Sequence, residues 1–279
     1  MIDSHHHLWA YSQREYGWID DSMAVIARDF NVADLRNAAE GAGVTGTVAV
    51  QARQVVEEND ALLKAADEDA FVLGVVGWLP PTEQAAAAEV ERHAGQAKLR
   101  GYRYVAQDEP DNRFLARDEF NAAVARVFAA PGDLVYDILI FERQLPAAIE
   151  VVDRHPSGRF VLDHLAKPRA AAGEVEPWRA NLSELAEREN VACKISGLVT
   201  EADWANWSLD SLRPYLDATL EAFGPKRLMF GSDWPVCLLA TGYERWLETV
   251  TAWAAPLSVT ERASLFGGCA IDAYRLDAS

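Results

Sequence analysis

The sequence predicts a (β/α)8 TIM barrel that forms a single domain over residues 1–279. Three observations predict it: eight short β-rich runs, amphipathic helical stretches between them, and about 25 to 45 residues from one run to the next, near the ~30 residues of a βα unit. A doubly wound open sheet is the main alternative. It is disfavoured because no GxGxxG motif follows the first run.

The predicted strands come first. In chain order they are residues 2–9, 44–51, 71–78, 99–105, 134–140, 160–165, 191–198 and 228–234. Several of them are continuous apolar runs without alternation, which is typical of parallel strands covered on both faces. They therefore favour a barrel enclosed by helices over an antiparallel sheet.

The stretches between the strands have apolar residues at three- and four-residue spacing, which predicts amphipathic helices. The clearest examples are residues 59–69, 83–94, 119–130, 144–155, 178–189 and 212–224. Ser258 and Glu261 fit a capping box at the start of the last helix. Residues 10–30 form a long, aromatic-rich connection after the first strand, and we expect a functional lid there.

Composition excludes several classes of protein. The chain has 26 Lys and Arg against 43 Asp and Glu, a net charge of −17, which disfavours nucleic acid or an anionic membrane as a partner. No apolar run is long enough to cross a membrane, and the polar start MIDSHHH does not resemble a signal peptide. Three widely spaced cysteines favour a reducing cytoplasm. We expect a small-molecule substrate as the partner; the sequence does not indicate an oligomeric state.

In a barrel, reactive side chains lie at the C-terminal ends of the strands. His5 and His7 end the first predicted strand, and because strand residues two apart share a face, they point the same way while His6 points to the other side. His164 ends the sixth strand and Asp233 the eighth. The remaining histidines, His93 and His155, lie in helical patterns and are expected at the surface.

The motifs DSHHHLW, GYR, DHLAKP, KISGL and GSDWP, in this order, resemble the amidohydrolase superfamily. More narrowly they resemble its amidohydrolase-2, lactonase-type group of fuconolactonases, rhamnonolactonases and pyrone-dicarboxylate lactonases. The resemblance covers nearly the whole chain and implies the distorted barrel of that family. It implies catalytic roles for His5, His7 and His164, with Asp233 as general base.

The same resemblance implies the ligands of a metal and the residues that contact substrate. The metal ligands would be His5, His7, His164 and Asp233. The resemblance implies substrate contacts for Arg103 and Gln51, and Lys194 lies in its KISG motif. Trp78 is added as a substrate contact because it lies at a strand end, where an aromatic face suits a sugar ring. The fifth strand ends in DILIFE, where metal-dependent relatives have a histidine, and no lysine replaces the bridging carbamate. We therefore expect at most one divalent ion, with zinc as the first choice, or metal-independent activity.

The predicted function is that of a hydrolase that opens a small lactone ring, with sugar-acid lactones as the first choice. Asp233 would accept a proton from the attacking water, and the histidines would polarise the carbonyl, directly or through a metal ion. Two alternatives stay open. One is a metal-dependent nonoxidative decarboxylase of the same superfamily, and the other is a barrel that binds a sugar acid without catalysis.

Overall fold

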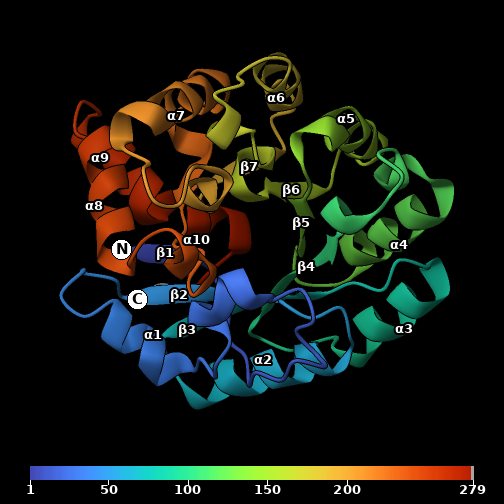
Figure 1. Ribbon diagram of the computed structural model, residues 1–279. Coiled ribbons are helices and arrows are strands. Elements are labelled where there is room, and N and C mark those ends of the chain that lie inside the picture. Colours follow the sequence, from blue (N-terminus) through green and yellow to red (C-terminus); the bar gives the residue numbers. More distant parts are fainter. Residues whose placement is uncertain (278–279) are drawn as a thin grey trace.

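The computed structural model describes residues 1–277 and places eight parallel strands in one sheet, each paired with the next along the chain. The strands are β1 (Ile2–His6), β2 (Gly46–Val50), β3 (Val72–Trp78), β4 (Leu99–Val105), β5 (Val135–Leu139), β6 (Arg159–Leu162), β7 (Val191–Ile195) and β8 (Leu228–Phe230). Helices surround the strands (Figure 1). The predicted (β/α)8 barrel is confirmed, and every strand lies within or next to its predicted range.

The helices are α1 (Val32–Ala38), α2 (Glu57–Glu68), α3 (Glu83–Arg92), α4 (Asp118–Ala129), α5 (Leu145–Arg154), α6 (Trp178–Ala186), α7 (Leu209–Phe223), α8 (Tyr243–Trp253), α9 (Val259–Ala263) and α10 (Cys269–Tyr274). The six predicted amphipathic stretches correspond to α2–α7, and the structure adds helices that were not predicted, α1, α8 and α10. The capping box of Ser258 and Glu261 at the start of α9 is present. None of the helices within residues 1–277 is long and apolar enough to span a membrane.

The seam of the barrel lies between β1 and the segment that follows β8. The backbone N–H of Asp233 donates to the carbonyl of His5 at 2.8 Å, and that of His7 donates to the carbonyl of Trp234 at 2.7 Å. Asp3 spans the same seam, because its Oδ1 accepts from the N–H groups of His5 and Ser232. The first and last strands are therefore joined close to the predicted functional residues.

The opposite end of the barrel is closed by α10. Tyr274 from this helix is buried together with Val48, Val76, Val135 and Met229 from the strands. A packed barrel interior leaves the C-terminal ends of the strands as the open face, where TIM barrels carry their sites.

Residues 10–30 fold back toward the barrel. Trp9 and Phe30 exchange backbone hydrogen bonds of 3.0 and 2.8 Å, and a short 3₁₀ helix covers Asp21–Ile26. The expectation that His93 lies at the surface is wrong: it is 3% exposed and its Nε2 lies 3.0 Å from Asp60. His93 is buried because it links α2 to α3, a contact between helices that a helical pattern does not reveal.

Candidate active site

A cavity of about 1000 Å³ opens at the C-terminal end of the strands. Its walls combine the predicted residues His7, Arg103, His164 and Asp233 with side chains from the long loop after β1. The other lining residues that bear on substrate recognition are Trp9, Arg14, Glu15, Trp18, Arg53, Gln54, Gln107, Asp108 and Lys167. Residues 10–30 therefore supply part of the cavity wall, as a lid would.

His5 and His7 point to the same side of β1, as the period of a strand requires. Their Nε2 atoms lie 3.2 Å apart, and Nδ1 of His7 lies 2.8 Å from the carbonyl oxygen of Val50. His6 points away and contacts the hydroxyl of Thr47 at 3.0 Å. The division of the histidine triplet that the sequence predicts is thus present.

Asp233 lies just beyond the end of β8, in a left-handed backbone conformation with φ of 55°. Ser232 before it is held by Asp3, and the indole of Trp246 donates to the carbonyl of Gly231 at 2.9 Å. These contacts direct the carboxylate of Asp233, which is 3% exposed, into the floor of the cavity.

His164 begins a left-handed turn. His164, Leu165, Ala166 and Lys167 all have φ between 49° and 58°, a conformation that costs roughly 1–2 kcal/mol for each such residue. The turn is held by the indole of Trp178, which donates to the carbonyl of Leu165 at 2.7 Å. It carries both His164 and Lys167 to the cavity.

Ser196 and Gly197, directly after β7, fix the ring of His164. Its Nδ1 lies 2.9 Å from the hydroxyl of Ser196. A Cβ atom on Gly197 would lie 2.5 Å from the same nitrogen, so only glycine leaves room for the ring. The last two residues of the KISG motif, directly after β7, therefore position the histidine that follows β6.

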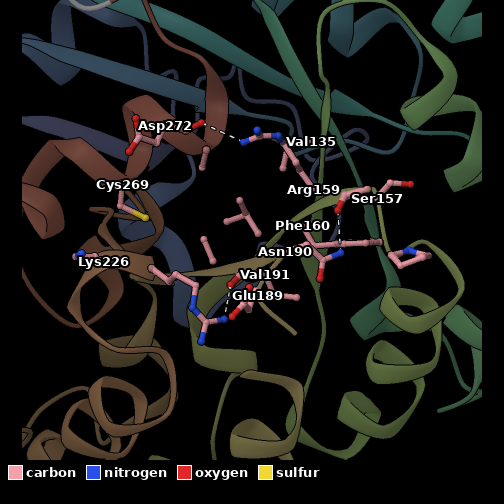
Figure 2. A pocket seen from close by; sticks show the side chains of 16 residues that line it. Val135, Ser157, Arg159, Phe160, Glu189, Asn190, Val191, Lys226, Cys269 and Asp272 are labelled. Atoms are coloured by element: carbon pink, nitrogen blue, oxygen red, sulfur yellow. Dashed lines mark hydrogen bonds between the residues drawn. The ribbon is translucent and has the colours of Figure 1, made fainter. Parts of the chain in front are cut away.

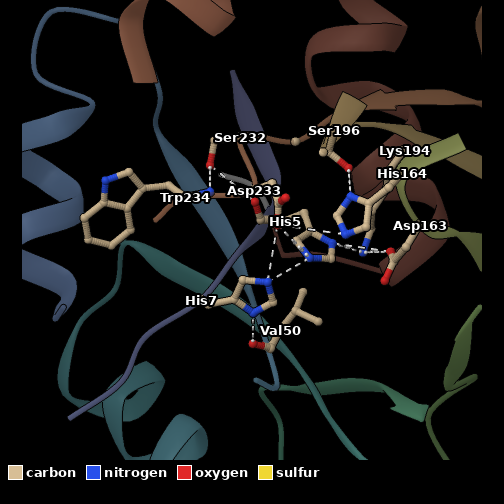
Figure 3. A network of polar contacts seen from close by, with 12 residues as sticks. His5, His7, Val50, Asp163, His164, Lys194, Ser196, Ser232, Asp233 and Trp234 are labelled. Atoms are coloured by element: carbon tan, nitrogen blue, oxygen red, sulfur yellow. Dashed lines mark hydrogen bonds and ion pairs between the residues drawn. The ribbon is translucent and has the colours of Figure 1, made fainter. Parts of the chain in front are cut away.

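The predicted catalytic residues converge on one place, as Figure 3 shows. Oδ1 of Asp233 lies 3.4 Å from Nε2 of His7, 3.7 Å from Nε2 of His5 and 3.9 Å from Nε2 of His164. His5, His164 and Asp233 offer ligand atoms that all lie within 4.8 Å of one another. Two imidazoles and a carboxylate at this separation can hold a divalent ion such as zinc.

Four buried charged groups lie beneath the histidines. Arg103 donates to Oδ2 of Asp163 at 2.8 Å, Lys194 lies 2.9 Å from Oδ1 of Asp163, and Lys194 donates to Asp137 at 2.5 Å. The hydroxyl of Tyr274 donates to Asp137 at 2.7 Å. Two cations thus balance two anions, an arrangement that buried charges require.

This charged network contacts His5 directly. Nζ of Lys194 lies 3.0 Å and Oδ1 of Asp163 lies 3.3 Å from Nδ1 of His5. We refer to Arg103, Asp163, Lys194 and Asp137 as the buried charge network.

The environment sets the protonation of the site. Burial, the largest influence, raises the pKa of Asp233, but the nearby His164 and His7 outweigh it and hold this pKa below its usual value. Burial lowers the pKa of His164 to about 4. Burial and then the charge of Lys194 lower the pKa of His5 well below its usual value. At neutral pH the site thus holds the carboxylate of Asp233 beside the neutral imidazoles of His5 and His164.

The four residues predicted to contact the substrate differ in their exposure to the cavity. Arg103 lines the cavity, although its guanidinium also donates to Gln51 and Asp163. Gln51 and Lys194 are fully buried, and Trp78 does not line the cavity. Gln51 contacts the guanidinium of Arg103, Lys194 lies between Asp137 and Asp163, and Trp9 and Trp18 line the cavity. Substrate contacts at Gln51, Lys194 and Trp78 stay predictions.

Sequence reasoning gave no role to Asp163, Asp137 or Tyr274. Asp163 lies inside the DHLAKP motif, directly before His164, and Asp137 interrupts an apolar strand. A carboxylate in such a strand must be paired, so that signal was available. Nothing in the sequence around Tyr274 indicates that its hydroxyl reaches Asp137.

A second cavity, of about 640 Å³, lies at the N-terminal ends of β5 to β7 (Figure 2). Two of its basic groups are engaged by backbone carbonyls, since Arg227 donates to the carbonyls of Ala186, Arg188 and Val191. Arg159 donates to the carbonyl of Asp272. This end of a TIM barrel generally serves stability, and the contacts agree with that role.

The comparisons with known proteins agree with this geometry. A family model described as "Amidohydrolase" matches residues 2–276. The chain belongs to the amidohydrolase family. The resemblance that the motifs indicate is confirmed, and with it the prediction of a hydrolase.

Two relatives of this amidohydrolase are named L-fucono-1,5-lactonase. The one from Burkholderia multivorans is 43% identical over 99% of this chain and 96% of its own length. The one from Burkholderia ambifaria is 38% identical, with the same coverage. A solved structure of an amidohydrolase from Burkholderia multivorans with bound zinc is 43% identical, covers 99% of each chain and has a TM-score of 0.92.

Proposed function

We propose that this amidohydrolase opens the ring of a sugar-acid lactone, and L-fucono-1,5-lactone is the first substrate to test. The observation that carries the proposal is the convergence of Asp233 with His5, His7 and His164 at the floor of one cavity. The names of the two Burkholderia relatives support the substrate class.

In this reaction Asp233 is the general base. Its carboxylate accepts a proton from a water molecule while the water oxygen forms a bond with the lactone carbonyl carbon. The bond between that carbon and the ring oxygen then breaks. Asp233 returns the proton to the ring oxygen, and a hydroxy acid is the product. The lowered pKa of Asp233 keeps the carboxylate ready to accept the proton.

The histidines stabilise the negative charge that develops on the carbonyl oxygen. His7 and His164 line the cavity and can approach that oxygen, while His5 lies behind them and is fully buried. We propose His5, His164 and Asp233 as the residues that hold a zinc ion, with His7 beside them. A zinc ion bound there supplies Lewis-acid polarisation of the carbonyl.

The remaining cavity wall fits a polyhydroxylated ring. Trp9 and Trp18 line the cavity with aromatic rings whose centroids lie 6.0 Å apart. Aromatic faces suit the C–H side of a sugar ring. Arg14, Arg53 and Gln107 offer donors for its hydroxyl groups. We propose that these residues orient the lactone over Asp233.

The test is release of acid from L-fucono-1,5-lactone, followed with a pH indicator alongside a panel of other aldonolactones. Asp233→Asn is the matched blank, because it keeps the fold and removes the base. We expect acid release well above that blank for at least one lactone. If every lactone gives the same rate with both proteins, the hydrolytic assignment fails; carbon dioxide release from an aromatic acid would then favour the decarboxylase alternative.

A further inference from the structure

Lys167 presents to the cavity a cation that the proposed mechanism does not use. It ends the left-handed turn that His164 begins, and its backbone N–H donates to the carbonyl of His164 at 2.7 Å. Its side chain, which is 16% exposed, lines the same cavity as His164 and Asp233. The turn therefore brings a histidine and a positive charge to the cavity together.

Two neighbouring side chains hold the ammonium group of Lys167 without taking up its hydrogen bonds. Nζ lies 3.7 Å from Oε1 of Glu201, which follows β7, and 5.6 Å from the ring centroid of Phe141, which follows β5. The first distance exceeds the length of an N–H···O hydrogen bond, and the second is a cation–π contact. Every N–H of an ammonium group is a donor. Those of Lys167 have no hydrogen-bond acceptor among the described residues, so they are free for a ligand.

The other cations of the cavity differ from Lys167. The guanidinium of Arg103 donates to Gln51 and into the buried charge network. That of Arg53 donates to two glutamates, and Arg14 is exposed on the long loop after β1. Within the described part of the chain, Lys167 is thus the partly buried cation of the cavity whose donors are unfilled.

Opening of a lactone ring creates a new anion in this cavity. The hydroxy acid loses its proton at neutral pH, as carboxylic acids do. One oxygen of the new carboxylate comes from the water that Asp233 activates, so this carboxylate forms beside that of Asp233. Like charges in one site repel each other, and the net charge of −17 adds to the repulsion. A product of this kind requires a cation with free donors.

We propose that Lys167 binds the carboxylate of the ring-opened sugar acid, so that the cavity is a binding site for the product as well as for the lactone. Its ammonium group donates to a carboxylate oxygen, and such charge-assisted hydrogen bonds are stronger than those between neutral groups. A neutral lactone carries no full negative charge, so Lys167 favours the acid over the lactone. The inference rests on the proposed function for the class of ligand.

The test compares Lys167→Met with Lys226→Met in metal-free protein, from which a chelator has removed any bound ion. Lys226 is exposed at the opposite end of the barrel, so its variant makes the same change in net charge away from the site. Lys167→Met leaves Glu201 without its ion-pair partner, so the charge-balanced combination with Glu201→Gln is measured as well. Thermal melting confirms that each protein is folded.

Isothermal titration calorimetry measures the affinity for L-fuconate, the acid formed from L-fucono-1,5-lactone, and for a panel of other aldonates. We expect Lys167→Met, alone and with Glu201→Gln, to weaken aldonate binding by at least about 10-fold, the effect of one hydrogen bond to a charged group. Lys226→Met should bind aldonates as the unmodified chain does. The proposal is overturned if the folded Lys167 variants bind as well as the unmodified chain, if Lys226→Met loses as much affinity as they do, or if the unmodified chain binds no aldonate of the panel.

A neutral ligand separates binding of the carboxylate from a change in the shape of the cavity. L-Fucitol has the hydroxyl groups of L-fuconate and a CH2OH group in place of the carboxylate. Lys167→Met should change the affinity for L-fucitol far less than that for L-fuconate. Absence of L-fucitol binding to an unmodified chain that binds L-fuconate would also support the proposal, because the carboxylate then carries the affinity. Equal losses for the two ligands overturn it.

These binding measurements do not depend on hydrolysis. If aldonates bind through Lys167 but no lactone releases acid, the inference holds and the proposed lactonase activity fails. If a lactone releases acid but aldonate binding is unaffected in the Lys167 variants, the proposed activity holds and the inference fails.

Discussion

Oδ1 of Asp233 lies 3.4 Å from Nε2 of His7, across the seam where the chain after β8 meets β1. The two residues come from opposite ends of the sequence. They are brought together because the backbone N–H of Asp233 donates to the carbonyl of His5. His7 lies two residues after His5, so its side chain points to the same side. The candidate active site therefore depends on closure of the barrel.

Asp233→Asn should lower kcat by at least about 100-fold, because the amide cannot accept the proton of the attacking water. The fold should persist, since asparagine tolerates the left-handed backbone conformation that Asp233 adopts. Steady-state lactone hydrolysis and thermal melting measure the two effects. Asp108→Asn, at an exposed carboxylate on the cavity rim, is the control. Normal turnover in a folded Asp233→Asn protein would remove Asp233 from the mechanism.

Gly197→Ala should displace His164, because the new Cβ would lie 2.5 Å from Nδ1 of its ring. A displacement of about 1 Å can lower the rate by roughly 100-fold. Gly173→Ala is a matched control: Gly173 has φ of 68° against 61° for Gly197, but no atom lies within 4 Å of its added Cβ. The left-handed conformation alone should cost each variant about 1–2 kcal/mol of stability, and Gly197→Ala should lose more because the ring of His164 must also move.

The kinetic comparison of the two glycine variants separates strain from displacement. Only Gly197→Ala should lose kcat. Equal losses of activity in the two proteins would show that backbone strain, and not the position of His164, is responsible.

Acid should destabilise the fold through His6. Burial, the main cause, lowers its pKa from 6.5 to about 3. At pH values between these two, the unfolded chain binds a proton on His6 and the folded chain does not. The free energy of unfolding therefore increases as the pH rises through this range and decreases on acidification. Acidification from pH 7 to pH 5 should lower the free energy of unfolding by about 2 kcal/mol through one such group.

His6→Gln removes this titration and keeps a polar group beside Thr47. Urea unfolding at both pH values should show a smaller loss of stability in the variant than in the unmodified chain. The buried acids titrate in both proteins, so their contribution to the pH dependence of stability cancels when the two proteins are compared. An identical pH dependence in the two proteins would mean that His6 is accessible to protons in the folded state.

The chain should bind at most one divalent ion, and a chelator should remove that ion without unfolding the protein. A domain of this size buries enough core to fold without a metal. The other convergence of ligand-type atoms, between Asp137, Asp163 and His5, is already filled by Nζ of Lys194. Elemental analysis and thermal melting before and after chelation give the answer. Two tightly held ions per chain would contradict this expectation.

The sequence by itself predicted the strands and their order, because parallel strands of a barrel are apolar on both faces and follow one another at a regular spacing. It also predicted that His5 and His7 share a face, since strand geometry is local. His164 and Asp233 were identified from motifs at strand ends. The strands and the shared face of His5 and His7 are confirmed because each depends on a short stretch of chain; the catalytic roles of His164 and Asp233 stay predictions.

Only the tertiary structure decided which polar residues face the cavity and which lie beneath it. Lys194 and Gln51 occupy strand positions that looked equivalent to Arg103, yet both are fully buried. Trp9 and Trp18 line the cavity and Trp78 does not. The hydroxyl of Tyr274 reaches Asp137 from the far end of the chain. Burial and charge pairing are set by groups distant in sequence, and pairing inside a barrel is determined only when all eight strands and α10 are in place.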